Sequence, residues 1–183
     1  MTQDQDVAHR LARILGRHAS VVERRLSWES VQERLGCPVH EDFKVICEIF
    51  PSGSFGGIIN FYNPVQSKEW RETFFGVVES KGETFRYARE QIPEEFPHFY
   101  HPEEGGMVPW GHGDQNTYFW CPGSVALTTV FIDNHGDGWG EFYGTIAEFL
   151  VELFDGGFRH EVLLDNFNDR RFFDEFSSSE FHY

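Results

Sequence analysis

The first residues of the chain follow the hydrophobic spacing of amphipathic helices. Residues 7–26 place an apolar residue at every third or fourth position with arginines between them, which predicts one helix over that range. Residues 28–35 repeat the pattern over a shorter length. Ser27 can accept hydrogen bonds from the first free N–H groups of that second helix, and Gly36 can take the left-handed conformation that ends it.

The pattern continues with a third helix, a strand and a long fourth helix. Residues 41–50 carry apolar side chains at spacings of three, four and seven, which predicts a helix, and the β-favouring run 58–62 predicts the first strand. Residues 68–90 predict a long helix, although Gly76 and Gly82 each weaken it by about 1 kcal/mol.

The second half of the chain changes to short segments rich in aromatic and β-branched residues. These segments are separated by glycine, proline and asparagine turns, which is typical of an antiparallel meander. We predict strands at 107–110, 117–121, 128–132 and 139–143. A last helix follows, because Thr145 and Glu148 form a capping box ahead of a helical apolar face that Gly156 closes.

The order of these elements predicts an α+β fold in a single domain, with helices packed around an antiparallel meander sheet. Residues 93–106 are a proline-rich loop between the two halves and mark no domain boundary. We divide the chain into an N-terminal amphipathic helix (1–26), the domain proper (27–176) and a tail (177–183). Phenylalanines after residue 165 predict that the first part of the C-terminal segment docks on the body, while 177–183 frays.

Composition supports a folded protein. The 183 residues are 40% hydrophobic and include 20 phenylalanines, six tyrosines and five tryptophans, which excludes a chain that is disordered throughout. No apolar run approaches the roughly 20 residues of a membrane-spanning helix, and the N-terminus lacks the pattern of a secretory signal. Three cysteines without paired spacing indicate a reduced, cytoplasmic protein.

The charge of the chain is distributed unevenly, and this bears on the kind of partner it can bind. The formal net charge is -15, and residues 90–183 contain 18 acidic residues against three arginines, so they carry the whole excess. Such a surface repels phosphate, which argues against nucleic acid as a ligand and favours a cationic partner. The plainer interpretation, that the acids only keep the protein soluble, stays open.

Several residues could carry chemistry, but no pattern is complete. His98 and His101 with the neighbouring glutamates could bind a metal, and residues 133–138 resemble part of a calcium loop without its bidentate glutamate. We interpret the first as a solvated loop and the second as a hairpin turn. The sequence leaves open whether the 133–138 loop binds an ion, and it predicts no cofactor.

A cysteine hydrolase is the remaining catalytic alternative. Cys121 with His112 or His135 and with Asp114 would supply a nucleophile, a base and an orienting carboxylate. Nothing in the sequence brings these residues together, so we predict no catalytic residues. Among the tryptophans we assign Trp120 to the core and leave the other late tryptophans open.

The order of motifs over residues 27–176 resembles the SUKH superfamily, the Smi and Knr type domain. The resemblance rests on Trp28, Leu35-Gly36 with Pro38, Asp42-Phe43-Lys44, Gly56-Gly57 and Pro64, then 105–111 (Gly-Gly-Met-Val-Pro-Trp-Gly) with Asp114, Phe119-Trp120, Trp139 and Phe149-Leu150. The chain departs from the family pattern at Cys37, at Val39 and at Phe43, where the family usually has tyrosine.

The resemblance implies an α+β fold without catalytic apparatus. Many bacterial members of the family are immunity proteins that neutralise toxin domains, often nucleases, and the fungal members regulate cell-wall assembly. We therefore expect a non-enzymatic immunity protein that binds a cationic toxin domain, with a regulatory or scaffold domain as the alternative. A monomer is favoured, although the sequence does not decide the oligomeric state.

The acidic loops of the second half are where we expect that partner to bind. The predicted partner-binding residues are Glu94, Glu95, Glu103, Glu104, Trp110, Asp114, Asp133, Asp137 and Trp139.

Overall fold

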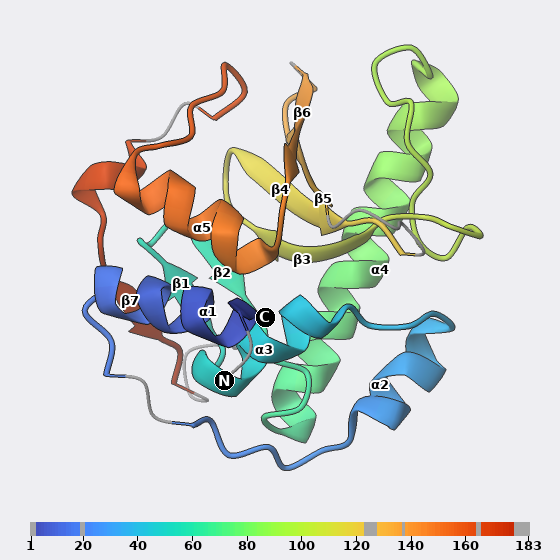
Figure 1. The fold of residues 1–183 in the computed structure, drawn as a ribbon. Helices are drawn as coiled ribbons and strands as arrows, with labels where there is room; N and C mark the ends of the chain where they lie inside the picture. The colour runs from blue at the N-terminus through green and yellow to red at the C-terminus, as the bar shows by residue number, and fades with distance from the viewer. Residues whose placement is uncertain (1–2, 19–20, 123–127, 137, 164–165, 178–183) are drawn as a thin grey trace.

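A seven-stranded antiparallel sheet forms the centre of the computed structural model, which describes residues 3–18, 21–122, 128–136, 138–163 and 166–177 (Figure 1). The strand order is β6-β5-β4-β3-β2-β1-β7. The strands are β1 (Gly53–Phe55), β2 (Ile59–Phe61), β3 (Val108–His112), β4 (Asn116–Trp120), β5 (Thr128–Asp133), β6 (Trp139–Tyr143) and β7 (Phe173–Glu175). Within these residues the chain is thus one α+β domain, as predicted.

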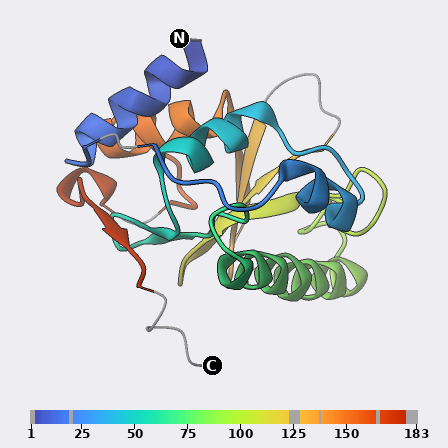
Figure 2. The same ribbon diagram turned by 90° about the horizontal axis from the view of Figure 1, so that it is seen from below.

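The part of the chain that the structure describes also contains five α-helices. They are α1 (Gln3–Ile14), α2 (Trp28–Leu35), α3 (Glu41–Ile49), α4 (Lys68–Gln91) and α5 (Ile146–Asp155), and a short 3-10 helix η1 (Phe167–Asp169) precedes β7. Figure 2 shows α1, α3 and α5 on one side of the sheet and α4 on the other. None of the described helices combines the length and apolar character needed to cross a membrane.

Alternation along the central strands divides their side chains between the two faces. On the α5 face, Tyr118 and Phe131 pack against Phe149, with ring centroids 5.8 and 5.7 Å away. On the α4 face, Phe119 packs against Phe85 of α4 and Tyr100 of the following loop, at 5.3 and 5.7 Å. Both faces of the sheet are therefore covered at its centre.

Phe43 connects α3 to the rest of the core. Its fully buried ring lies 4.8 Å from Trp120 of β4, 5.7 Å from Phe61 of β2 and 5.9 Å from Phe74 of α4. The neighbouring Asp42 is also buried, and its Oδ2 accepts a hydrogen bond from the backbone N–H of Ile146 at 2.9 Å. This carboxylate fixes the start of α5 against the start of α3.

The helix predictions for the middle and the end of the chain are confirmed. The capping box of α5 is complete, because Thr145 Oγ1 accepts from Glu148 N at 3.0 Å and Glu148 Oε2 accepts from Thr145 N at 2.8 Å. α4 is continuous through both of its glycines. Close packing requires the glycine at position 82, because a Cβ there would lie 2.5 Å from the carbonyl oxygen of His101.

The prediction of one helix over 7–26 is wrong. α1 ends at Ile14, and Gly16 follows with a φ of +65°. Arg17 N donates to Ala12 O at 2.8 Å, which is a Schellman ending of the kind that glycine favours. The segment after residue 20 instead runs beside α3 and the β2–α4 loop, where Val22 N donates to Glu48 O at 2.8 Å.

Two short strands have no counterpart in the prediction. β1 pairs with both β2 and β7, and its first residue, Gly53, allows a close approach. A Cβ at Gly53 would lie 2.3 Å from the carbonyl oxygen of Asp174 and 2.5 Å from the ring of Phe173. The C-terminal segment thus docks on the body as expected. The predicted fraying of 177–183 falls, apart from Ser177, on residues outside the described part.

Candidate functional site

Strand β6 forms one edge of the sheet and carries exposed aromatic side chains. Its residues Trp139, Glu141 and Tyr143 pair with Ile132, Val130 and Thr128 of β5, so their side chains point to the α4 face. α4 and its loop do not cover them completely, because Trp139 is 36% exposed and Tyr143 is 73% exposed. Exposed aromatic side chains of this kind are typical anchors of protein interfaces.

The loop after α4 adds a histidine and a carboxylate to this strand. The His98 ring lies edge-on to Trp139 with centroids 4.5 Å apart. Glu95 and Trp139 line an open hollow of about 460 Å³ beside the β5–β6 turn. Tyr143 Oη donates to Glu141 Oε2 at 2.5 Å. We call these five residues, Glu95, His98, Trp139, Glu141 and Tyr143, the β6 surface.

The electrostatics of the β6 surface are acidic and uncompensated. Neither Glu95 nor Glu141 forms an ion pair within the described residues. Burial lowers the pKa of His98, and Glu141 opposes that shift only in part. His98 is therefore neutral at pH 7 and does not offset the two carboxylates.

The predicted partner-binding residues fall in three places. Glu94 and Glu95 are exposed on the loop after α4, where Glu95 lines the same hollow as Trp139 of β6. Asp114 is exposed but lines a different hollow, of about 220 Å³, beside the β1–β2 turn. Glu103 is paired with Arg89 at 3.2 Å, and Glu104 follows it, exposed, near the start of β3.

Two of those residues require a correction because they are buried. Trp110 is 2% exposed and packs between Tyr118 and Phe149, so it belongs to the core. Asp133 is 5% exposed, and its Oδ1 accepts from His135 N at 2.6 Å inside the β5–β6 turn. Neither side chain offers surface to a partner. Asp137 lies outside the described residues.

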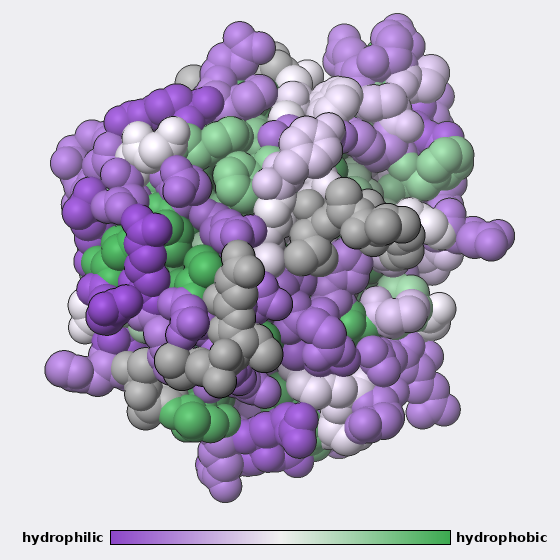
Figure 3. Space-filling view, in the orientation of Figure 1, coloured by the Kyte–Doolittle hydropathy of each residue, from purple (hydrophilic) through white to green (hydrophobic). Residues whose placement is uncertain are grey.

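The acids of residues 90–183 are not all free to meet a partner. Acids of α5 and of the C-terminal segment face arginines, since Asp155 pairs with Arg10 at 2.8 Å and with Arg171 at 3.6 Å, and Glu175 pairs with Arg17 at 3.4 Å. Figure 3 shows hydrophilic residues over most of this face, with hydrophobic ones mainly between α1 and α5, and residues of intermediate hydropathy over β6. The acids of residues 90–183 thus divide into a paired group and an unpaired group.

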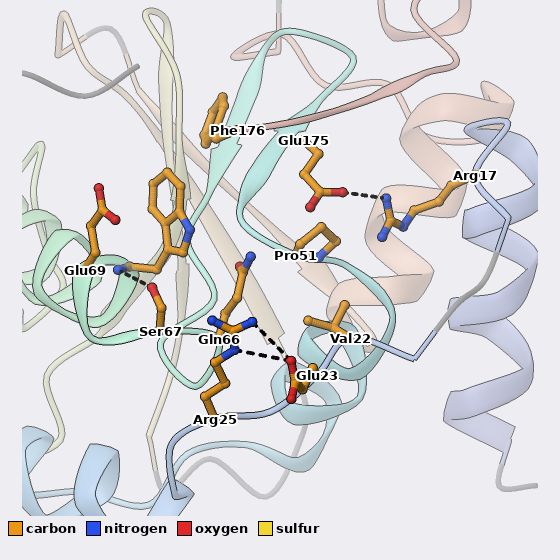
Figure 4. Close-up of a pocket in the computed structure, with 11 residues that line it drawn as sticks. Arg17, Val22, Glu23, Arg25, Pro51, Gln66, Ser67, Glu69, Glu175 and Phe176 are labelled. Carbon is orange, nitrogen blue, oxygen red and sulfur yellow. Dashed lines mark hydrogen bonds and ion pairs between the residues drawn. The ribbon is translucent and has the colours of Figure 1, made fainter. Parts of the chain in front are cut away.

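A further hollow, of about 510 Å³, lies between the α1–α2 connection, the start of α4 and β7 (Figure 4). Both arginines that line it are already paired there, Arg17 with Glu175 and Arg25 with Glu23. Ser67 on its wall accepts from the first turn of α4. These groups hold segments of the chain together, and we assign no ligand to the hollow.

The histidines of the imagined metal site are directed to different elements. His98 contacts Trp139 of β6, whereas His101 Nε2 lies 2.8 Å from the carbonyl oxygen of Leu35 in α2. Among the described residues, no group of three or more His, Cys, Asp or Glu side chains is arranged to hold a metal ion. The geometry thus gives this alternative no support.

The residues of the imagined hydrolase lie at opposite ends of one strand pair. His112 ends β3 and pairs with Thr117, while Cys121 follows Trp120, which pairs with Val108 at the other end. Burial raises the pKa of Cys121 to about 11, and it lowers the pKa of His112 to about 4. A thiol with a raised pKa is a poor nucleophile, and the base is out of reach.

Three residues of the β6 surface were not among the predicted partner-binding residues: His98, Glu141 and Tyr143. The alternation of residues 139–143 contained a signal for two of them, because Trp139, Glu141 and Tyr143 share one face of any strand there. That β6 lies at an edge, with its aromatic side chains exposed, depends on strand order. The sequence pattern does not contain that order.

Comparisons of the chain with protein-family models, with curated proteins and with solved structures find no match. The resemblance to the SUKH superfamily that the order of motifs suggests therefore stays a prediction.

Proposed function

We propose that the protein is a non-enzymatic immunity protein whose β6 surface binds and neutralises a cationic toxin domain. The observation that carries the proposal is the combination, on one edge strand and the loop beside it, of exposed aromatic side chains with carboxylates that have no cationic partner among the described residues. Aromatic anchors supply binding energy, and unpaired charge of one sign selects a partner of the other sign.

A nuclease toxin fits this chemistry. An enzyme that binds the phosphate backbone needs a positively charged surface, and an acidic face can compete for it with fast, salt-sensitive association. The similarity to SUKH immunity proteins supports the same class of partner. We place the protein in the cytoplasm, where Cys37, Cys47 and Cys121 would stay reduced.

Co-expression with the product of the adjacent reading frame, where that product is a toxin domain, tests the proposal. We expect growth rescue, a complex that co-purifies, and association that slows as salt rises. The Tyr143→Ala variant should lose rescue, whereas Tyr87→Ala, which removes a similarly exposed tyrosine from α4, should keep it. If the unmodified chain gave no rescue and formed no complex, the proposal would be overturned. A cellular protein captured at high salt would favour the regulatory alternative.

A further inference from the structure

The hydrogen-bond register shows which backbone groups of β6 are directed away from the sheet. Asp133 N donates to Gly138 O at 2.9 Å, and Asn134 N donates to Gln115 O at 2.7 Å. In an antiparallel ladder, alternate residues of a strand bond to alternate neighbours. Odd-numbered residues of β5 therefore bond to β6, and even-numbered ones bond to β4.

The same alternation applies to β6. Gly140 and Phe142 lie opposite Phe131 and Thr129, so their backbone groups bond to β5. Trp139, Glu141 and Tyr143 lie opposite even-numbered residues, so their N–H and C=O groups face outward. No backbone hydrogen bond elsewhere in the described chain involves these three residues.

Trp139, Glu141 and Tyr143 thus each direct one N–H and one C=O away from the sheet. Two of these three residues also carry the exposed aromatic side chains. We propose that β6 accepts an extended, cationic segment of the partner as an additional strand of the sheet. The inference rests on the proposed function, because the cationic partner is the toxin domain. Strand addition of this kind gives affinity through backbone hydrogen bonds and specificity through alternate side chains.

Charge decides between this occupant and a second copy of the chain. An antiparallel β6–β6 pairing that uses all three outward residues places Glu141 opposite Glu141 of the other copy, between two chains of net charge -15. Like charges directly opposite each other destabilise a strand pair. A cationic segment instead places a lysine or arginine opposite Glu141, with apolar or arginine side chains beside Trp139 and Tyr143.

The other edge of the sheet is a poorer acceptor. β7 has three residues, Phe173–Glu175, whereas β6 has five. Short edge strands are one way in which proteins avoid unwanted pairing. The length and the exposed side chains of β6 therefore distinguish it from β7.

A peptide of seven residues that alternates lysine and valine tests the strand pairing without the toxin domain. Bound as an added strand, it should protect the amides of Trp139, Glu141 and Tyr143 from hydrogen exchange. The amides of Gly140 and Phe142 should not change, because they already bond to β5. Failure to bind, or binding without this alternation, would overturn the inference. Dimerisation of the protein through β6 would also contradict it.

Two variants at one position test the pairing in the complex with the toxin domain. Glu141→Ala removes the charge and keeps the N–H, while Glu141→Pro also removes the outward N–H, a change that an edge strand tolerates. We expect Glu141→Pro to weaken the complex about tenfold more than Glu141→Ala. Equal affinity of the two variants would refute strand addition and leave the proposed function standing.

The two proposals can fail separately. If the unmodified protein forms no complex with the toxin domain, the proposed function fails, and the peptide experiment still decides whether β6 accepts a cationic strand. If Glu141→Pro does not fold, as judged by circular dichroism, the hydrogen-exchange pattern of the unmodified protein decides in the same way.

Discussion

Two regions of this protein use similar residues for opposite purposes. Around α5, Asp155 lies opposite arginines, and Phe149 is fully buried between this helix and the sheet. On the β6 surface, Glu95 and Glu141 have no cationic partner among the described residues, and Tyr143 is exposed. The difference follows from the neighbours that the fold supplies. α1 brings arginines and an apolar face to α5, whereas no described segment pairs with the outer edge of β6.

The largest effect should come from the buried side of this comparison. Phe149→Ala removes a ring that packs against Phe131 and Phe142, so we expect the free energy of unfolding to fall by about 3–5 kcal/mol. Urea denaturation measures the change. Tyr143→Ala is the matched control and should change stability by less than about 0.5 kcal/mol. Similar losses in both variants would remove the distinction between the two regions.

The change of stability with pH below 7 tests whether interior groups or surface ion pairs contribute more to it. Burial lowers the pKa of His112 to about 4, while an unfolded histidine titrates near 6.5. The unfolded state thus binds the proton first, and stability contributed by neutral His112 is lost as pH falls from about 6.5 to 4. The full loss is of the order of 3 kcal/mol.

His112→Gln, which cannot titrate, should flatten this dependence in urea denaturation at a series of pH values. Asp155→Asn is the control, because it affects only the partly exposed ion pairs with Arg10 and Arg171. If His112→Gln kept the pH dependence of the unmodified protein and Asp155→Asn removed it, surface ion pairs would account for that dependence instead.

The exposed side of the comparison should affect binding and leave the fold intact. Trp139→Ala should weaken the toxin complex by about 2 kcal/mol, or roughly thirtyfold, because tryptophan is a typical interface anchor. Calorimetric titration measures the affinity. Tyr87→Ala on α4 is the control, and equal losses in the two variants would place the interface elsewhere.

The smallest effect should come from the ion pair between α1 and α5. Arg10 and Asp155 are both about half exposed, with side-chain exposures of 52% and 42%. We expect Arg10→Gln to lower the free energy of unfolding by less than about 1 kcal/mol, and less still at high salt. A larger loss that salt does not reduce would show that the pair matters more than its exposure suggests.

Local signals in the sequence were sufficient for most helices. The capping box of α5 and the Ser27 and Gly36 ends of α2 were predictable because their hydrogen bonds lie within a few residues. Gly16 carries the same kind of signal, but the apolar spacing through Leu26 concealed it. Val22 and Leu26 are only half-buried in an extended segment, which bonds to Glu48 and Val65 rather than to itself.

The site was less predictable than the fold. Sequence position placed Glu95 in an acidic loop and Trp139 at the start of a strand. It could not show that Trp110 is buried, since the core around Phe149 comes from a distant helix. It also could not show that Asp155 faces Arg10, 145 residues away along the chain.

The sequence by itself determined the α+β class, the meander and the acidic excess after residue 90, because hydrophobic period, turn residues and charge are local properties. Only the tertiary structure decided which acids are neutralised and which strand has a free edge. Those outcomes depend on which distant segment packs beside each residue, and β6 differs from β4 in having a described neighbour on one side alone.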